Sequence, residues 1–450
     1  MKNLYIKNYG CQMNAYDAGR MVDLLQQSHT LSMVETPQQA DLIILNTCHI
    51  REKADDKIFS ELGRLKKLTN RHDPKKRYIF GVGGCVGQAQ GAELFKRAPF
   101  VDLVFGPQNY HHLPHMLDQV LQGKRQLHDI EIPTESKFDA LPSAPNSGYS
   151  AAVPVQEGCD RFCTYCVVPF TRGREWSRPV EDIIQEVQNL TDKGAMEIEL
   201  LGQNVNAYLG YDQEGVEHDL ALLIRQVSLV PGVERIRFIT SHPADMNNDL
   251  IAAFAEVPEL NSYMHLPIQS GSDKILAAME RGHTVAEYLT WIEKLKRVCP
   301  KITLASDFIV GFPGETEEKF EELLSFIKET KFEKLGAFIY SSEEGTDAYD
   351  MPDKVSEMLK KKRFEKLMMA QQNISLEKQQ QFIGKVLRVM IDEKKKTQKD
   401  CYIGRSEYDF HEVDGVVHVN SEKELSPGDF VDVKITDAYE YDLSGIVISD

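Results

Sequence analysis

The 450-residue chain is predicted to be an α/β protein with three parts: an N-terminal open parallel α/β sheet, a central partial (β/α)6 barrel and a small C-terminal antiparallel β-barrel. Two observations carry this prediction. Strand-like apolar runs alternate with amphipathic helical runs over most of the chain. After Gly384 the pattern changes to short, evenly spaced strands, which are typical of a small barrel. A single core is not expected at this length, so we predict domains at 1–125, 145–375 and 380–450.

The first domain is predicted from three strands and the helices between them. The strands are Leu4–Lys7, Asp41–Leu45 and Arg77–Val82, and the amphipathic stretches include Gly19–Gln27 and Lys57–Leu68. Strands that alternate with helices favour a parallel sheet. The stretch Glu131–Ser150 contains Pro, Ser and Asn and lacks periodicity, so it is interpreted as a linker.

The central domain has six predicted strands, namely Ala151–Gln156, Glu197–Leu201, Arg235–Ile239, Tyr263–Leu266, Thr303–Ile309 and Leu335–Tyr340. Helical stretches such as Glu181–Leu190 and Glu318–Thr330 lie between them. Six such units predict a barrel or part of one, with ligands at the C-terminal ends of the strands. A charged helix over Lys354–Gln381 leads to the last domain, whose strands are KVLRVMI, CYIGRS, GVVHV, FVDVKI and GIVIS.

Composition and charge limit the classes of function. The chain is 42% hydrophobic and 27% charged, as in soluble globular proteins. Its formal net charge of -17 excludes a broad basic field, so RNA contact would need a local basic patch, and a basic protein partner fits equally well. No apolar run is long enough to span a bilayer, and the start MKNLYIKNYG is interpreted as a strand rather than a signal peptide. We therefore expect a cytoplasmic protein without membrane contact, whose 8 cysteines are metal ligands or free thiols.

Three cysteines form a tight loop motif in the central domain. Cys159, Cys163 and Cys166 have C-x3-C-x2-C spacing in GCDRFCTYC, directly after a predicted strand. Three thiolates can hold three irons of a [4Fe-4S] cluster and leave the fourth iron open for a small molecule. The alternatives are three structural thiols or a zinc site. Zinc would need a fourth ligand, typically from a second pair of ligands, and none follows nearby.

A second set of cysteines lies in the first domain. Cys11, Cys48 and Cys85, in YGCQMN, LNTCHI and GGCVGQ, are separated by two intervals of 37 residues, about one β-α unit each. Each follows a predicted strand, and the C-terminal strand ends of an open parallel sheet meet at one edge, where ligands bind. Three unrelated buried cysteines are the alternative. Cys299 and Cys401 fall outside any ligand spacing and are interpreted as structural.

The stretch GCDRFCTYCVVPFTRGREWSRP resembles the cluster loop of the radical S-adenosylmethionine (SAM) superfamily, in particular its methylthiotransferase branch, and GCQMN and NTC resemble the N-terminal domain of that branch. This resemblance implies two [4Fe-4S] clusters. The loop cluster binds SAM and cleaves it to a deoxyadenosyl radical, and an auxiliary cluster on Cys11, Cys48 and Cys85 carries the sulfur to be transferred. It further implies a low-potential electron donor and a terminal barrel of the TRAM type that grips the substrate.

The same resemblance implies further cofactor-binding residues, namely Tyr165, Asn204, Gln269, Gly311 and Gly314. Tyr165 is at the aromatic position that lies near the adenine of SAM, and the others are in LLGQNVNAY, HLPIQSGS and DFIVGFPGE, which line the SAM and substrate sites. The two glycines would let backbone approach a ligand closely, or would simply make a turn.

A local basic cluster follows the loop. Arg172, Arg174 and Arg178 are the densest group of cations near the loop cysteines. They either contact a phosphate of the substrate or form a solvated surface, and the sequence leaves both readings open.

The substrate expected from the resemblance is the anticodon stem-loop of tRNA. Motifs over residues 1–310, such as NTCHIREKADDKIF, are most similar to enzymes that methylthiolate carbon 2 of N6-isopentenyladenosine beside the anticodon. YSSEEGTDA departs from that pattern, and GRSEYDFHEVDGVV and DAYEYDLSG are similar to the sister enzymes that modify an aspartate of a small-subunit ribosomal protein. Residues 381–450 hold 9 Lys and Arg against 15 Asp and Glu, which suits a basic protein. Residues around the reacting centre should match the modified atom, so tRNA is favoured and the ribosomal protein is the alternative.

Two other classes of function are compatible with cysteine motifs. An electron-transfer protein would not need a barrel-sized central domain, and its clusters would normally be fully ligated by protein. A zinc-dependent RNA-binding module would need tetrahedral sites. Neither accounts for an open iron in each cluster.

Overall fold

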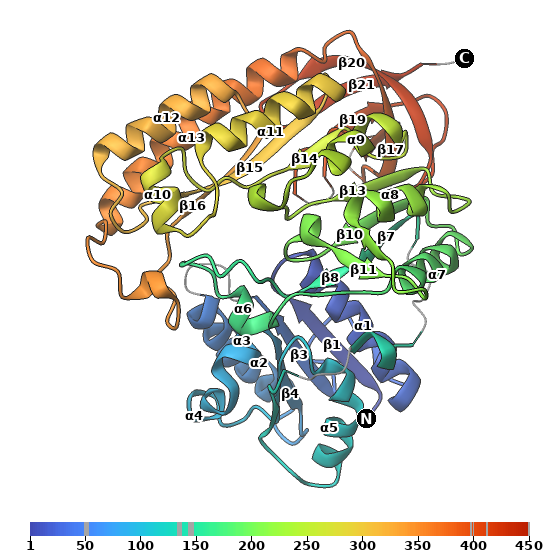
Figure 1. The fold of residues 1–450 in the computed structure, drawn as a ribbon. Helices are drawn as coiled ribbons and strands as arrows, with labels where there is room; N and C mark the ends of the chain where they lie inside the picture. Colours follow the sequence, from blue (N-terminus) through green and yellow to red (C-terminus); the bar gives the residue numbers. More distant parts are fainter. Residues whose placement is uncertain are drawn as a thin grey trace. The chain divides into compact units, whose positions relative to one another are not determined.

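The computed structural model describes residues 1–48, 54–132, 137–142, 148–396, 398, 400–410 and 413–448. The chain forms two compact units (Figure 1). The first consists of Met1–Pro145, Glu157–Phe162 and Cys166–Trp176, and the second of Asn146–Gln156, Cys163–Tyr165 and Ser177–Asp450. The second unit therefore contains most of the central domain together with the terminal barrel. The domain limits 1–125, 145–375 and 380–450 stay predictions. Within the described ranges, no helix has the length and apolar character needed to cross a bilayer.

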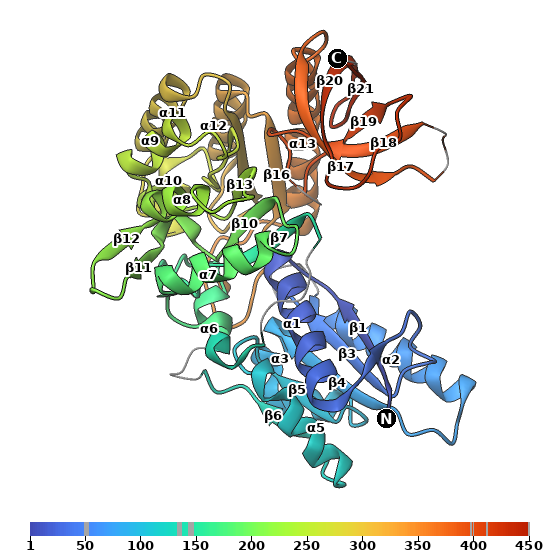
Figure 2. The ribbon, with the colours of Figure 1, turned by 90° about the vertical axis from the view of Figure 1, so that its right-hand side faces the viewer.

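The first unit is built on a parallel sheet with the strand order β2-β1-β3-β4-β5-β6 (Figure 2). Its strands are β1 Asn3–Asn8, β2 Ser32–Met33, β3 Leu42–Thr47, β4 Ile79–Gly84, β5 Leu103–Phe105 and β6 Leu127–Asp129. Its helices are α1 Gln12–His29, α2 Ala54–His72, α3 Cys85–Gln90, α4 Leu94–Arg97, α5 Leu113–Leu121 and α6 Val168–Arg172. The predicted open parallel sheet is confirmed, and the three expected strands became β1, β3 and β4.

Both faces of this sheet are covered because successive strand residues point to opposite sides. On β3, Leu42 and Ile44 join a core with the apolar sides of α1 and α5. Ile43 and Leu45, one position along, join a separate core with α2, α3 and α4. Because both faces are covered, every residue of β3 and β4 is buried. Their sequences therefore begin with mainly apolar residues and do not alternate between apolar and polar ones.

The linker expected at Glu131–Ser150 is only partly correct. Residues 133–136 and 143–147 lie outside the described residues. Lys137–Ala140 form a 3-10 helix, and the Lys137 side chain is 1% exposed because two carboxylates hold its ammonium group. The segment lacks periodicity in the sequence, yet part of it is a short helix that is anchored by the ion pairs of Lys137.

The central domain contains two three-stranded parallel sheets, β13-β10-β7 and β14-β15-β16. A parallel bridge between Ile236 of β13 and Leu260, just before β14, links them into an open run of six strands. The strands are β7 Ser150–Pro154, β10 Glu197–Leu201, β13 Arg235–Phe238, β14 Tyr263–His265, β15 Thr303–Val310 and β16 Lys334–Ile339, with β8 Gln156–Glu157, β9 Trp176–Ser177, β11 Leu209–Tyr211 and β12 Glu217–Asp219 outside this run. The six predicted strands are all present, and they form the partial barrel that was expected.

Helices follow the strands of this barrel. They are α7 Val180–Thr191, α8 Leu220–Ser228, α9 Asn248–Glu256, α10 Asp273–Ala278, α11 Val285–Val298, α12 Glu317–Thr330 and α13 Glu357–Gln380. Several begin where a polar side chain accepts a hydrogen bond from the first turn. Thr284 and Glu287 form a reciprocal capping box at α11, and Ser356 caps α13.

The terminal barrel closes in the order β17-β18-β19-β21-β20. Its strands are β17 Val386–Lys394, β18 Cys401–Arg405, β19 Val417–Asn420, β20 Phe430–Ala438 and β21 Leu443–Val447. The predicted small barrel is confirmed, with one difference: β19 and β21 pair in parallel, whereas the other pairs are antiparallel. The parallel pair arises because β20 runs antiparallel to both β19 and β21. The strand β21 then lies between β19 and β20 in the sheet.

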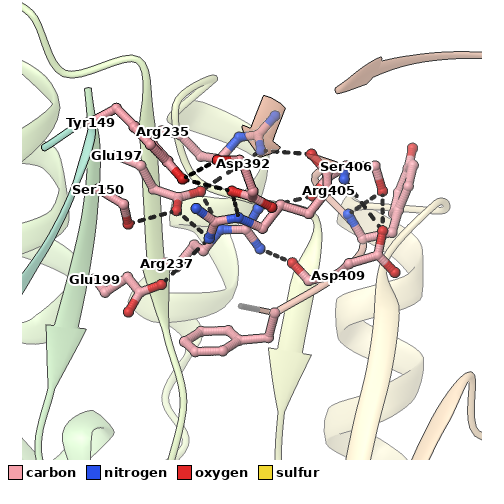
Figure 3. Close-up of polar contacts among 12 residues, drawn as sticks. Tyr149, Ser150, Glu197, Glu199, Arg235, Arg237, Asp392, Arg405, Ser406 and Asp409 are labelled. Atoms are coloured by element: carbon pink, nitrogen blue, oxygen red, sulfur yellow. Dashed lines mark hydrogen bonds and ion pairs between the residues drawn. The ribbon is translucent and has the colours of Figure 1, made fainter. Parts of the chain in front are cut away.

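A buried ionic cluster joins the barrel strands to the terminal barrel within the second unit (Figure 3). Glu197 of β10 is 0% exposed and accepts from Arg237 Nε at 2.5 Å and Arg405 Nη1 at 2.6 Å. Arg237 comes from β13 and also donates to the backbone oxygens of Ser406 and Asp409. One carboxylate therefore holds arginines from both domains.

Candidate functional site

The three cysteines of the first domain lie at the carboxyl ends of neighbouring strands. Cys11 follows β1 and is the N-cap of α1, Cys48 directly follows β3, and Cys85 follows β4 as the first residue of α3. Because β1, β3 and β4 are adjacent and parallel, these positions share one edge of the sheet. The structure thus brings together the strand ends that were expected to meet.

Polar side chains from the cysteine motifs tie these strand ends to one another. Asn14, in GCQMN, donates to the backbone oxygen of Thr47 at 2.9 Å. Asn46, in LNTC, donates to the backbone oxygen of Asn14 at 2.7 Å. Thr47 donates to the backbone oxygen of Gly83 at 2.5 Å and accepts from the backbone N–H of Val86 at 3.2 Å. The non-cysteine residues of the motifs therefore fix the backbone on which the thiols sit.

Glycines permit this close approach. A Cβ on Gly10 would lie 2.8 Å from the Cβ of Cys48. Gly84 has φ +85°, and a Cβ there would lie 2.4 Å from the backbone oxygen of Thr47. Side chains at these positions would push the cysteine-bearing segments apart. The Gly-Cys pairs at residues 10–11 and 84–85 follow from this geometry.

Cys85 is the buried member of the three and has a cation beside it. Burial raises the pKa of the Cys85 thiol, and the Arg172 guanidinium opposes that rise by its charge and a hydrogen bond. Arg172 ends α6, the short helix that follows Cys166 in the chain. Its positive charge favours the thiolate, which is the metal-binding form of cysteine.

Arg172 belongs to a buried charge quartet with Lys137, Asp17 and Glu157. The Arg172 guanidinium contacts Asp17 at 3.0 Å and Glu157 at 3.1 Å, and Lys137 Nζ contacts the same carboxylates at 3.1 and 2.6 Å. Two cations and two carboxylates balance, which is the condition under which charges are tolerated in a protein interior. Sequence reasoning missed Asp17, Glu157 and Lys137; the only signal was an acidic residue within or beside a cysteine motif.

Within the second unit, Cys163 is the buried cysteine of the loop and also faces an arginine. Arg281 Nη1 donates to Cys163 Sγ at 3.3 Å, and its Nη2 donates to the backbone oxygen of Pro267 at 2.6 Å. His242 Nε2 lies 4.0 Å from the same sulfur. Its Nδ1 accepts from the backbone N–H of Ala244, so a neutral ring carries its proton on Nε2, facing the sulfur. Neither Arg281 nor His242 stood in a recognisable metal motif, so sequence reasoning missed both.

Tyr165 and Asn204, two of the expected cofactor residues, are fixed by their neighbours. Tyr165 packs edge-on against Phe312, with ring centroids 6.5 Å apart. Asn204 is 2% exposed and donates to Asp245 at 2.8 Å, while its side-chain oxygen is buried with no hydrogen-bond partner among the residues that the structure describes. A polar ligand would satisfy that oxygen.

The remaining expected residues lie after β14 and β15. Gln269 has φ +78° and bridges Phe308 through its backbone. Gly311 and Gly314 both have positive φ, and a Cβ on Gly311 would lie 2.3 Å from Lys360 Cγ. Both glycines adopt a turn conformation, and Lys360 of this chain lies close to Gly311, while their role toward a ligand stays a prediction.

The basic cluster expected after the loop is not a single surface. Arg172 is buried against Asp17 and Glu157, as described above. Arg178 is 6% exposed and donates to the backbone oxygen of Pro154 at 2.8 Å and to Glu186 at 2.7 Å. Arg174 alone is exposed, at 76% of its side chain. Substrate contact by these arginines stays a prediction, and the alternative of a solvated surface fits Arg174 alone. The guanidinium groups of Arg172 and Arg178 contact internal carboxylates and a backbone oxygen.

The donor set at both places fits an iron–sulfur cluster. Among the described residues, no three or more His, Cys, Asp or Glu side chains are placed to hold one metal ion. A [4Fe-4S] cluster makes a different demand, because each thiolate binds its own iron around the cluster. Each cysteine set supplies three thiols that form no disulfide, and one thiol of each set is buried beside a buried arginine. Cys299 and Cys401 are buried far from either motif in the sequence.

Comparison with known proteins finds three family models along the chain. "Uncharacterized protein family UPF0004" matches residues 3–106, "Radical SAM superfamily" matches residues 153–327, and "TRAM domain" matches residues 383–448. The three matches fall on the parallel sheet without β6, on the partial barrel without β16, and on the closed terminal barrel.

Curated relatives match over the full length. A protein of Magnetococcus marinus is 52% identical over 450 residues, which are 100% of both chains. A protein of Ectopseudomonas mendocina is 46% identical and covers 99% of this chain and 98% of the relative. Both carry the name tRNA-2-methylthio-N(6)-dimethylallyladenosine synthase.

Solved structures support the fold. The radical S-adenosylmethionine methyltransferase TsrM from Kitasatospora setae superposes with a TM-score of 0.55 at 13% identity, over 78% of this chain and 77% of that one. The cobalamin-dependent S-adenosylmethionine radical enzyme OxsB gives a TM-score of 0.52 at 15% identity, over 83% of this chain and 56% of that one. At these identities the likeness concerns the fold alone.

Proposed function

Because the chain belongs to the tRNA-2-methylthio-N(6)-dimethylallyladenosine synthase family of radical SAM methylthiotransferases, we propose that it adds a methylthio group to carbon 2 of N6-isopentenyladenosine beside the anticodon of tRNA. The relatives include the terminal barrel in their full-length match, although that barrel carried the resemblance to the ribosomal-protein enzymes. This supports tRNA over the ribosomal protein as substrate.

The observation that carries the proposal is the placement of Cys11, Cys48 and Cys85 at three adjacent strand ends. We propose that these thiolates hold an auxiliary [4Fe-4S] cluster and that Cys159, Cys163 and Cys166 hold the cluster that binds SAM. When bound, these cofactors supply hydrogen abstraction from carbon and the methylthio group. The protein supplies thiolates, their charge balance through Arg172 and Arg281, and a fixed backbone around them.

Several residues would position SAM, and an electron donor is needed in addition. Tyr165 would lie beside the adenine, and the buried oxygen of Asn204 would accept a hydrogen bond from the ligand. Gln269, Gly311 and Gly314 would form the backbone around it. A low-potential electron donor is required to reduce the loop cluster, and the tRNA substrate makes the cytoplasm the expected compartment.

Replacing Arg281 by glutamine is expected to lower the midpoint potential of the loop cluster by roughly 50 mV. The Arg281 hydrogen bond at 3.3 Å stabilises negative charge on Cys163, and one-electron reduction adds negative charge to the cluster. About 1 kcal/mol of preferential stabilisation corresponds to a shift of this size. The measurement is a potentiometric titration followed by electron paramagnetic resonance, with iron content as the check on loading. Arg281→Lys keeps a cation and should shift the potential less; an unchanged potential in Arg281→Gln would contradict the assignment.

A competition assay tests the function itself. Anaerobically reconstituted enzyme receives SAM, sulfide, a reductant, isopentenylated tRNA and the small-subunit ribosomal protein together. Mass spectrometry of nucleosides and peptides is expected to show methylthio-adenosine and no methylthio-aspartate. Methylthio-aspartate alone would reject the proposal and favour the ribosomal protein. tRNA without the isopentenyl group serves as the substrate control.

A further inference from the structure

An exposed pair of aromatic rings lies on the segment that carries the loop cysteines. Phe162, directly before Cys163, is 38% exposed, and Phe170 of α6 is 56% exposed. The rings meet edge to face with centroids 6.3 Å apart. Phenylalanine is usually buried, and apolar side chains that touch one another on a surface indicate a place that another molecule covers.

The backbone at Phe162 is strained. Its φ is +43°, in the left-handed region that bulky residues rarely adopt. Strained residues persist mainly where the surrounding structure holds them for a function. A phenylalanine that served only to fill the core would gain nothing at this position, since its ring is exposed and its backbone is strained.

An arginine accompanies the rings. The Arg174 guanidinium carbon lies 5.5 Å from the centroid of Phe162, and the side chain is paired with Asp160 at 2.8 Å. Nearby in sequence, Trp176 is 40% exposed and stacks on Phe138 at 5.9 Å. Exposed rings together with a planar guanidinium are the groups on which unstacked nucleic-acid bases lie.

We propose that Phe162, Phe170 and Arg174 form a stacking platform for an RNA base that neighbours the modified adenosine. This inference rests on the proposed function, which requires a single-stranded loop of RNA to reach the cysteine loop. Stacking depends little on net charge, so it allows an acidic chain of net charge -17 to hold RNA. With Arg172 and Arg178 buried, Arg174 is left as the exposed cation of that cluster. A basic peptide would instead be attracted by carboxylates and would not need ring faces.

The test uses full-length reconstituted enzyme and one fluorescent probe. The probe is an isopentenylated hairpin of the anticodon arm with 2-aminopurine beside the target adenosine. Wild-type enzyme is expected to quench the fluorescence on binding. Phe162→Leu and Phe170→Leu keep apolar volume but remove the ring face, so each should weaken the Kd about tenfold and reduce the quench. The rise in KM for the hairpin should exceed any fall in kcat.

Two controls separate stacking from folding. Tyr211→Leu removes another exposed aromatic ring, 50% exposed in the β11–β12 hairpin, and should leave Kd unchanged. Phe162→Gly removes the ring and tolerates positive φ, so it should lose affinity while its Tm stays equal or rises.

Distinct outcomes overturn the platform and the function. If wild-type enzyme makes no methylthio-adenosine, the proposed function fails. If it modifies the hairpin while both leucine variants bind and quench as the wild type does, only the platform fails. The platform also fails if these variants weaken binding of a basic ribosomal-protein peptide and leave hairpin binding intact.

Discussion

Replacement of Glu197 by glutamine is expected to lower the free energy of unfolding by about 3–5 kcal/mol. Glu197 is fully buried and accepts from Arg237 and Arg405, which come from the two domains that it joins (Figure 3). Glutamine keeps the shape but removes the buried carboxylate that Arg237 and Arg405 share, so that Arg405 is left with Asp392 and Glu199. Chemical denaturation at neutral pH measures the loss. Glu199→Gln is the matched control, because Glu199 is on the same strand and its ion pair with Arg405 is longer, at 3.6 Å; equal losses in the two variants would contradict the assignment.

The stability difference between wild type and Glu197→Gln should also depend on pH. Burial opposes ionisation of Glu197, but Arg237, Arg405 and Arg235 outweigh it and hold its pKa at about 2. The unfolded value is 4.5, so the folded pKa is depressed. The contribution, about 3 kcal/mol, is therefore complete above the unfolded pKa and disappears as pH falls from 4.5 toward 2. Denaturation series over that range should show the two proteins converging; a gap that persists at pH 2 would argue against this origin.

Removing the three loop cysteines together is expected to abolish SAM cleavage. It should also lower the iron content of the protein by about half. The variant Cys159→Ala, Cys163→Ala and Cys166→Ala leaves the ligand set of the first domain intact. Deoxyadenosine formation, measured by chromatography, should fall to background, while iron and sulfide analysis should still find one cluster. Retained SAM cleavage would refute the assignment of the loop.

The reciprocal variant is the control. Cys11→Ala, Cys48→Ala and Cys85→Ala should also lose about half of the iron but keep SAM cleavage. It should form no methylthio product, because the sulfur site is removed. If both variants lost all iron, the two sets of cysteines would belong to one site, contrary to the proposal.

Much of the fold followed from local pattern. The strands at 197–201 and 303–310 were predictable because short, largely apolar segments that alternate with helical stretches are typical of parallel sheets. The parallel pairing of β19 with β21 was not, since each strand reads the same whether its neighbour runs parallel or antiparallel. Strand order depends on long-range packing, which periodicity does not record.

The site was predictable where residue type and spacing suffice. Six cysteines in two sets stood out because thiolates at strand ends have few other uses. Arg281 and Lys137 did not stand out, since each contacts a site residue that lies more than 100 positions away in the sequence, Cys163 and Asp17 respectively. The burial of Arg172 in the basic cluster was missed for the same reason. The sequence shows the charge of Arg172, but it does not show that Asp17 and Glu157 neutralise this charge in the folded protein.

The helix α6 sets a fixed interval between Cys166 and the arginine that lies beside Cys85. Cys166 stands just before it and Arg172, the cation beside Cys85, is its last residue. One inserted residue would turn Arg172 by about 100° around the helix axis and carry it off Asp17 and Glu157. The length of the segment between these two residues is therefore constrained by the ion pairs of Arg172, independently of which residues lie within it.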